Sequence, residues 1–144
     1  FITSEARSLP PSTVTQEVVR EVEVIREVVR EVASGGSALV VDKPLRSGQH
    51  VYAKGRDLVV LAMVNPGAEI MADGHIHVYA PLRGKAIAGA KGDTSARIFT
   101  SSLEAELLSI AGVYRTSDMP IPIEVTGKAA QVWLVNDKLV MQAL

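Results

Sequence analysis

The fold is decided by residues 48–92, GQHVYAKGRDLVVLAMVNPGAEIMADGHIHVYAPLRGKAIAGAKG, because this stretch repeats. Three tripeptides of the form Ala-Lys-Gly or Ala-Asp-Gly begin at Ala53, Ala72 and Ala90, which are 19 and 18 residues apart. A short apolar run follows each of them. A period of this size is too short for helical-hairpin repeats and fits one coil of a parallel β-helix. A stack of such coils buries a continuous apolar column that no single coil can bury alone.

The composition agrees with narrow β-coils. Hydrophobic residues make up 47% of the chain but aromatic residues only 4%, so Val, Leu, Ile and Ala must build the core. Small residues such as Ala72 and Ala86 suit the narrow interior of a β-helix. The alternative is a β-sandwich whose turns happen to look alike. We expect an all-β fold, with a short parallel β-helix as the favoured architecture.

Length and charge restrict the classes of function. The 144 residues are enough for one domain and a tail, and they begin at Phe1 without a Met, so we expect a fragment of a longer protein. The net charge of −1 provides no basic field, and no nucleic-acid partner is expected. The chain has no Cys, which excludes disulfides, thiolate catalysis and Cys-based zinc sites. No apolar run is long enough for a membrane-spanning helix.

A flexible break at residues 34–37, Ser-Gly-Gly-Ser, marks the expected domain boundary. It divides a linker, residues 1–37, from a β-helix domain, residues 38–144. Within the linker, five apolar residues between Val18 and Val32 are spaced 4, 3, 4 and 3 residues apart, as in a heptad seam. This spacing predicts a helix over 13–33 that could pair as a coiled coil, whereas the abundance of Val and of charge leaves a disordered linker equally open.

Residues 101–112, SSLEAELLSIAG, depart from the β-period. A Ser cap, acidic residues in the first turn, apolar Leu103, Leu107 and Ile110, and a terminal Gly predict one short helix over 102–111. We expect this helix to lie against the column. Further on, residues 129–135 and 138–142 read as strands, and the Asn136-Asp137 pair between them predicts a tight turn.

The chain contains neither of the glycine-rich nucleotide-binding motifs. His75 and His77 would share one face of a strand and could bind a metal, but no acidic third ligand stands at a persuasive spacing. Ser47, His50 and Asp57 could be read as a hydrolase triad, but a triad is defined by geometry and not by proximity in sequence. We expect no catalytic residue, metal or cofactor, and the sequence favours a binding module.

Several motifs in sequence order resemble one known family. Arg46-Ser47-Gly48-Gln49, then residues 67–79 (GAEIMADGHIHVY), 83–90 (RGKAIAGA) and 105–112 (AELLSIAG), look like the C-terminal domain of MinC, the bacterial septum-site-determining inhibitor of cell division. The resemblance covers about residue 44 to the C-terminus. It implies a right-handed parallel β-helix, a triangular prism, that forms a homodimer through one apolar face. It also implies that residues 1–37 are an interdomain linker and that residues 38–144 are the dimerisation and partner-binding domain.

The resemblance further implies two protein partners. One is MinD, a membrane-associated ATPase that would bind in its ATP-loaded state and recruit a cytoplasmic protein to the inner face of the membrane. In the family the Arg-Ser-Gly-Gln turn binds MinD, which implies Arg46, Ser47, Gly48 and Gln49 here, with Gly67 as a further contributor. The other partner is the C-terminal tail of the division GTPase FtsZ, for which the corresponding position here is Lys85.

Lys85 departs from the family pattern, in which Arg is common at this position. Lysine keeps the positive charge but loses the bidentate fork of the guanidinium group. Two functions are carried forward. The first is a non-enzymatic inhibitor that blocks formation of the division ring, and so of the septum, at wrong sites. The second is a small β-helix enzyme acting on glycan or acyl substrates, against which the scarcity of aromatic residues argues because sugars stack on aromatic rings.

Overall fold

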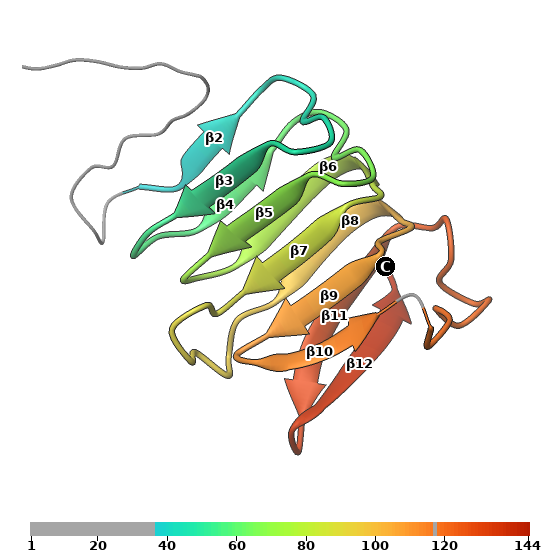
Figure 1. The fold of residues 1–144 in the computed structure, drawn as a ribbon. Coiled ribbons are helices and arrows are strands. Elements are labelled where there is room, and N and C mark those ends of the chain that lie inside the picture. Colours follow the sequence, from blue (N-terminus) through green and yellow to red (C-terminus); the bar gives the residue numbers. More distant parts are fainter. Residues whose placement is uncertain (1–36, 117) are drawn as a thin grey trace, which may run out of the picture. The chain divides into compact units, whose positions relative to one another are not determined.

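The computed structural model describes residues 37–116 and 118–144, which form a stack of short β-strands (Figure 1). One sheet has five strands in the order β10-β9-β7-β5-β3, and the other has six in the order β12-β11-β8-β6-β4-β2. The strands are β2 (Leu39–Val41), β3 (His50–Ala53), β4 (Leu58–Val60), β5 (Glu69–Ala72), β6 (Ile76–Leu82), β7 (Lys85–Ala88), β8 (Ile98–Leu103), β9 (Leu107–Ile110), β10 (Val113–Thr116), β11 (Ala130–Val135) and β12 (Lys138–Ala143). The described residues contain no helix.

Successive coils stack in parallel and in register. In one sheet β2, β4, β6 and β8 pair in order, and in the other β3, β5, β7 and β9 do the same. A third side of each coil is marked by parallel bridges that join Leu45 to Val64 and Val64 to Leu82. The coil therefore has three sides, and the predicted parallel β-helix of triangular cross-section is confirmed.

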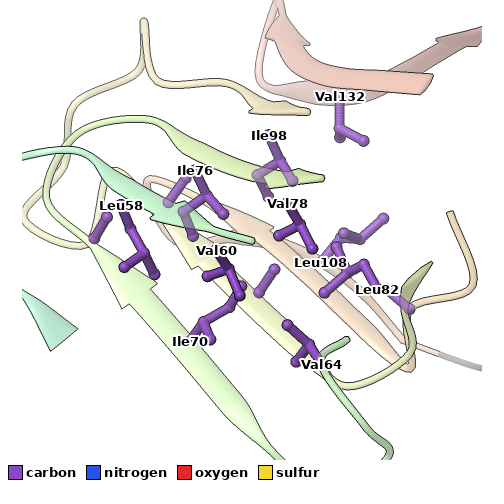
Figure 2. Close-up of a cluster of buried hydrophobic side chains, with 14 of the residues drawn as sticks. Leu58, Val60, Val64, Ile70, Ile76, Val78, Leu82, Ile98, Leu108 and Val132 are labelled. Carbon is purple, nitrogen blue, oxygen red and sulfur yellow. The ribbon is translucent and has the colours of Figure 1, made fainter. Parts of the chain in front are cut away.

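The column inside the coils is apolar apart from the buried Thr100. Side chains alternate along each strand, so that β5 and β7 both bury every second residue. Leu58, Ile70, Ile76 and Ile98 are fully buried and belong to the cluster shown in Figure 2. Each such side chain contributes about 1.5–3 kcal/mol relative to leaving it in water. This column fixes the register of every coil, because a slip by one residue would turn the apolar side chains outward.

The predicted helix over 102–111 is wrong. Residues up to Leu103 belong to β8, and β9 occupies Leu107–Ile110 in register with β7. Stacking on β7 places Leu108 and Ile110 inside the column, and this burial outweighs local helix signals, which are only a weak prior. The terminal Gly112, at φ +86°, belongs to the turn between β9 and β10 and not to a helix end.

The parallel stack ends in antiparallel strands. Strand β10 turns back along β9, and β11 runs antiparallel to β8 and forms a hairpin with β12 (Figure 1). Asn136 and Asp137 lie between β11 and β12 with φ of 51° and 60°, as in the two-residue turns that suit a hairpin. The predicted tight turn is thereby confirmed. These strands lie at one end of the column, and Ala130 and Val132 of β11 belong to its buried cluster.

The linker predictions lie largely outside the described part of the chain. The expected helix or disordered segment over 13–33 falls within residues 1–36, which the structure does not describe, and the boundary at 37–38 remains a prediction. Within residues 37–116 and 118–144, no helix is long and apolar enough to cross a membrane.

Candidate functional site

The 46–49 turn lies at a corner of the first coil, between the third-side residue Leu45 and the start of β3. A corner is taken here as the segment from a third-side residue to the first residue of the strand that follows it. The successive corners are residues 45–50, 64–69, 82–85 and 103–107. The first two corners are therefore equally wide, and the third is two residues shorter.

The 46–49 turn is closed by its own residues. The Gln49 N–H donates to the Arg46 carbonyl oxygen at 3.0 Å, and the Gln49 side-chain oxygen accepts the Arg46 N–H at 2.7 Å. Gly48 has a φ of +86°, a conformation that other residues rarely adopt. All four residues are exposed. The turn thus holds a fixed backbone while the Arg46 and Ser47 side chains stay at the surface.

Gly67 lies next to this turn, although it is on the following coil. The Gly48 N–H donates to the Gly67 carbonyl oxygen at 3.0 Å. A Cβ added to Gly67 would come within 2.3 Å of the Ser47 Oγ, and Gly67 itself has a φ of +85°. The structure therefore brings Gly67 together with Ser47 and Gly48, and it explains why a side chain at position 67 would disturb the turn.

Two acidic residues near the turn were missed by the sequence reasoning. Glu106 accepts the Gly67 N–H through its Oε2 at 2.8 Å, from the corner of the fourth coil. Glu69 starts β5 and lies 3.2 Å from the His50 Nδ1. The sequence placed Glu106 on a helix, and only the register of the coils shows that it reaches Gly67.

Lys85 lies on the same sheet but apart from the turn. It starts β7, in register between Glu69 on β5 and Leu107 on β9, so β5 separates it from β3 (Figure 1). Beside it, the Arg83 Nε donates to the Glu104 Oε1 at 2.9 Å. A hydrogen bond from Ser102 and the charge of Arg83 hold the pKa of Glu104 below its usual value. Arg83 is thus paired, and Lys85 is the cation of this corner without such a partner among the described residues.

The other candidates from the sequence are not assembled into sites. Asp57 accepts the His75 N–H at 2.7 Å, whereas His50 contacts Glu69, so the possible triad is not formed. The His75 Nδ1 accepts the Arg97 N–H at 2.9 Å, and the His77 ring stacks on the Phe99 ring. Within residues 37–116 and 118–144, no three His, Cys, Asp or Glu residues are grouped so that they could hold a metal.

The outer side of the sheet formed by β2, β4, β6 and β8 is largely apolar. Its ladder runs Val40, Val59, His77, Phe99, and the rings of His77 and Phe99 stack at 4.8 Å. Three large side chains there are well exposed, Val40 at 56%, Leu61 at 50% and Tyr79 at 59%. We call the set Val40, Val59, Leu61, His77, Tyr79 and Phe99 the apolar face. Contiguous exposed apolar patches of this kind usually mark an interface.

Comparison with known proteins gives a consistent result. Residues 39–144 match the family model described as septum formation inhibitor MinC, C-terminal domain. The chain is 57% identical over 121 residues to the probable septum site-determining protein MinC of Chromobacterium violaceum, covering 83% of this chain and 50% of that protein. It is 59% identical over 108 residues to the protein of the same name from Bordetella avium, covering 75% and 39%. The chain thus spans half or less of the length of these relatives.

A solved structure shares the fold. It is the MinC:MinD cell division protein complex of Aquifex aeolicus, with a TM-score of 0.66 and 31% sequence identity. The match covers 74% of this chain and 86% of that chain.

Proposed function

The chain belongs to the family of the C-terminal domain of the septum formation inhibitor MinC, and from this premise we propose that it is the partner-binding and dimerisation part of a non-enzymatic cell division inhibitor. The observation that carries the proposal is the 46–49 turn, an exposed and closed turn stacked on Gly67. A relative 31% identical has been solved in a MinC:MinD complex. We infer that this turn binds MinD in its ATP-loaded state at the membrane.

The chemistry of the turn supports a protein partner. Arg46 offers five N–H donors in a fixed plane, Ser47 a hydroxyl, and Gly48 a backbone that a partner can approach closely. Among the described residues, no carboxylate lies within ion-pair distance of Arg46. Because the turn is held before binding, less conformational entropy is lost when the partner docks.

The test is recruitment to lipid vesicles by ATP-loaded MinD. Arg46→Ala should weaken binding by about 2 kcal/mol or more, roughly thirtyfold, because Arg at the centre of an interface often carries a large share of the energy. Arg46→Lys should restore binding only in part. Lys54→Ala, which removes an exposed cation at another corner, is the matched control. Normal recruitment of a folded Arg46→Ala variant, checked by circular dichroism, would show that MinD docks elsewhere.

Lys85 is proposed as the contact for the acidic C-terminal tail of FtsZ. Glu69 and Leu107 are its neighbours in the ladder, so the half-buried cation stands between an acid and an apolar side chain on the outer side of the sheet. Such a surface pair is modest in energy. The apolar face is proposed as the homodimer interface. The enzyme alternative gains no support, because the residues considered for it make separate structural contacts.

A further inference from the structure

Glu106 connects two distant corners of the column. Its N–H donates to the Gly84 carbonyl oxygen at 3.0 Å, so its backbone stacks on the third corner. Its carboxylate nevertheless accepts the N–H of Gly67, in the second corner, 39 residues away in sequence. It passes the third corner because that corner, residues 82–85, is two residues shorter than those before it.

The third corner also lies unusually close to the second. A Cβ added to Gly84 would come within 2.4 Å of the Ala68 carbonyl oxygen and 2.7 Å of the Asn65 carbonyl oxygen. Glycine at position 84 therefore allows the backbones to approach. This close approach brings the Glu106 carboxylate within reach of Gly67.

Gly67 transmits this contact to the 46–49 turn. Its N–H is held by Glu106 at 2.8 Å, and its carbonyl oxygen accepts the Gly48 N–H at 3.0 Å. The Gly67 α-carbon lies against Ser47, so there is no room for a side chain between them. Glu106, Gly67 and the turn thus form a continuous chain of contacts from the fourth coil to the first.

We infer that Glu106 is a positioning residue for MinD binding, which acts by fixing Gly67 and through it the conformation of Ser47 and Gly48. This inference rests on the proposed role of the 46–49 turn. A hydrogen bond to a carboxylate is stronger than one between neutral groups. Gly67 is exposed, and without this bond its backbone is held only by the bond from Gly48 and by the Ala68-to-Asn65 bond that closes its own turn. An exposed turn that is fixed beforehand binds more tightly than the same turn when mobile.

The test compares two substitutions at position 106 in the full chain. Glu106→Gln keeps a side-chain oxygen that can accept the Gly67 N–H, whereas Glu106→Ala removes it. Glu104→Ala is the matched control, because Glu104 lies two residues earlier and contacts Ser102 and Arg83 instead. Arg46→Ala shows whether the turn itself binds. The readouts are affinity for ATP-loaded MinD on vesicles and the amide proton resonance and exchange rate of Gly67 and Gly48.

We expect Glu106→Ala to weaken binding about tenfold, to move the Gly67 resonance upfield and to speed its exchange, as loss of a charged hydrogen bond predicts. Glu106→Gln should stay within about threefold of the parent, since the bond survives in neutral form. Glu104→Ala should leave the Gly67 and Gly48 resonances and the affinity unchanged.

Other outcomes overturn the inference in distinguishable ways. If Glu106→Ala changes the Gly67 resonance but not the affinity, Glu106 only braces the fold. Equal losses for Glu106→Gln and Glu106→Ala would mean that the charge contacts MinD directly. If Arg46→Ala binds normally while Glu106→Ala does not, Glu106 acts independently of the turn. Normal binding by both variants removes the proposed site together with the inference.

Discussion

At the scale of single residues, the proposed contact with the acidic FtsZ tail depends on the positive charge at position 85. Lys85→Glu should weaken binding of the FtsZ tail several-fold at low salt, because an attraction becomes a repulsion, and the difference should shrink as salt rises. Dimerisation should be unaffected, since Lys85 lies on the sheet of β3, β5, β7 and β9 and not on the apolar face. The measurement is a titration of a labelled tail peptide at two salt concentrations.

Lys54→Glu, which reverses an exposed charge at another corner, controls for the change in net charge. Tail affinity equal to that of this control would move the contact away from Lys85. Lys85→Arg offers a complementary measurement, because a guanidinium fork can bind a carboxylate through two hydrogen bonds. It should bind the tail at least as tightly as the parent.

Single residues also show how far sequence reasoning reached. Arg46, Ser47, Gly48, Gln49 and Gly67 were selected through the resemblance, and the structure places all five together. Glu106 was not selected, because its contact spans 39 residues and depends on a shortened corner in between. No local pattern reports such a contact. It follows only from the register of four stacked coils.

At the scale of secondary structure, the repeat predicted the parallel strands because successive strands of one sheet recur at similar spacings, 19, 16 and 22 residues from His50 to Glu69, Lys85 and Leu107. The helix prediction for residues 102–111 was wrong because the local helix signals conflict with the register in which β9 stacks on β7. In sequence, Ser102 followed by Glu104 looks like the start of a helix. In the structure, the Ser102 hydroxyl donates to the Glu104 carboxylate at 2.6 Å, at the corner between β8 and β9. A helix and a strand over this segment would also bury different leucine side chains in the column, and this difference can be measured.

Leu107 and Leu108 distinguish the two readings. The helix would bury Leu107, whereas β9 buries Leu108 and leaves Leu107 on the outer side of the sheet. Leu108→Ala should cost about 2–5 kcal/mol of unfolding free energy, because it opens a cavity in the column. Leu107→Ala should cost clearly less. Urea unfolding of the two variants provides the measurement, and the reverse order would favour the helix.

Protonation of His77 should destabilise the strands that surround it. Burial lowers the pKa of His77, nearby His75 lowers it further, and only the charge of Asp57 raises it. The folded protein therefore keeps His77 neutral at a pH where the unfolded chain begins to bind a proton. The stability that this provides is fully present above the ordinary pKa of 6.5 and is lost as the pH falls through the window below it.

His77→Phe isolates this effect, because a Phe ring can replace the imidazole in the stack on Phe99. Urea unfolding at pH 7.5 and 5.5 should show a smaller loss of stability for this variant than for the parent. Asp93 and Glu104 do not contribute to the change between pH 7.5 and 5.5, since their pKa values lie below the ordinary 3.8 and 4.5. An equal loss in both proteins would mean that His77 is not the group responsible.

At the scale of the whole molecule, the described column of coils presents an apolar outer surface to solvent. The apolar face runs along β2, β4, β6 and β8, and half or more of Val40, Leu61 and Tyr79 is exposed. The C-terminal antiparallel strands close the end of the column but leave these side chains exposed. A second copy of the chain offers the same face, and pairing by a two-fold axis is the commonest closed arrangement.

We therefore expect Leu61→Asp to produce a folded monomer. A charge introduced within an apolar interface would have to be buried without a partner, which is costly. In the monomer the same side chain is half exposed, so the fold should tolerate the change. Ile123→Asp is the matched control, because Ile123 is 84% exposed and lies outside the apolar face. Sedimentation at micromolar concentration should give a dimer for the parent and for this control.

The same measurement on residues 38–144 separates the apolar face from the linker. If the dimer persists without residues 1–37, the face alone holds it together. If that fragment is monomeric, the linker segment 13–33 would be responsible for dimerisation, and the apolar face would bind a different partner. A Leu61→Asp variant that remains dimeric in the full chain would point the same way. The 46–49 turn precedes β3, the edge strand of the other sheet, and lies away from the apolar face. The monomeric variant should therefore still bind MinD, but without the additional affinity that a dimer gains by binding at two sites.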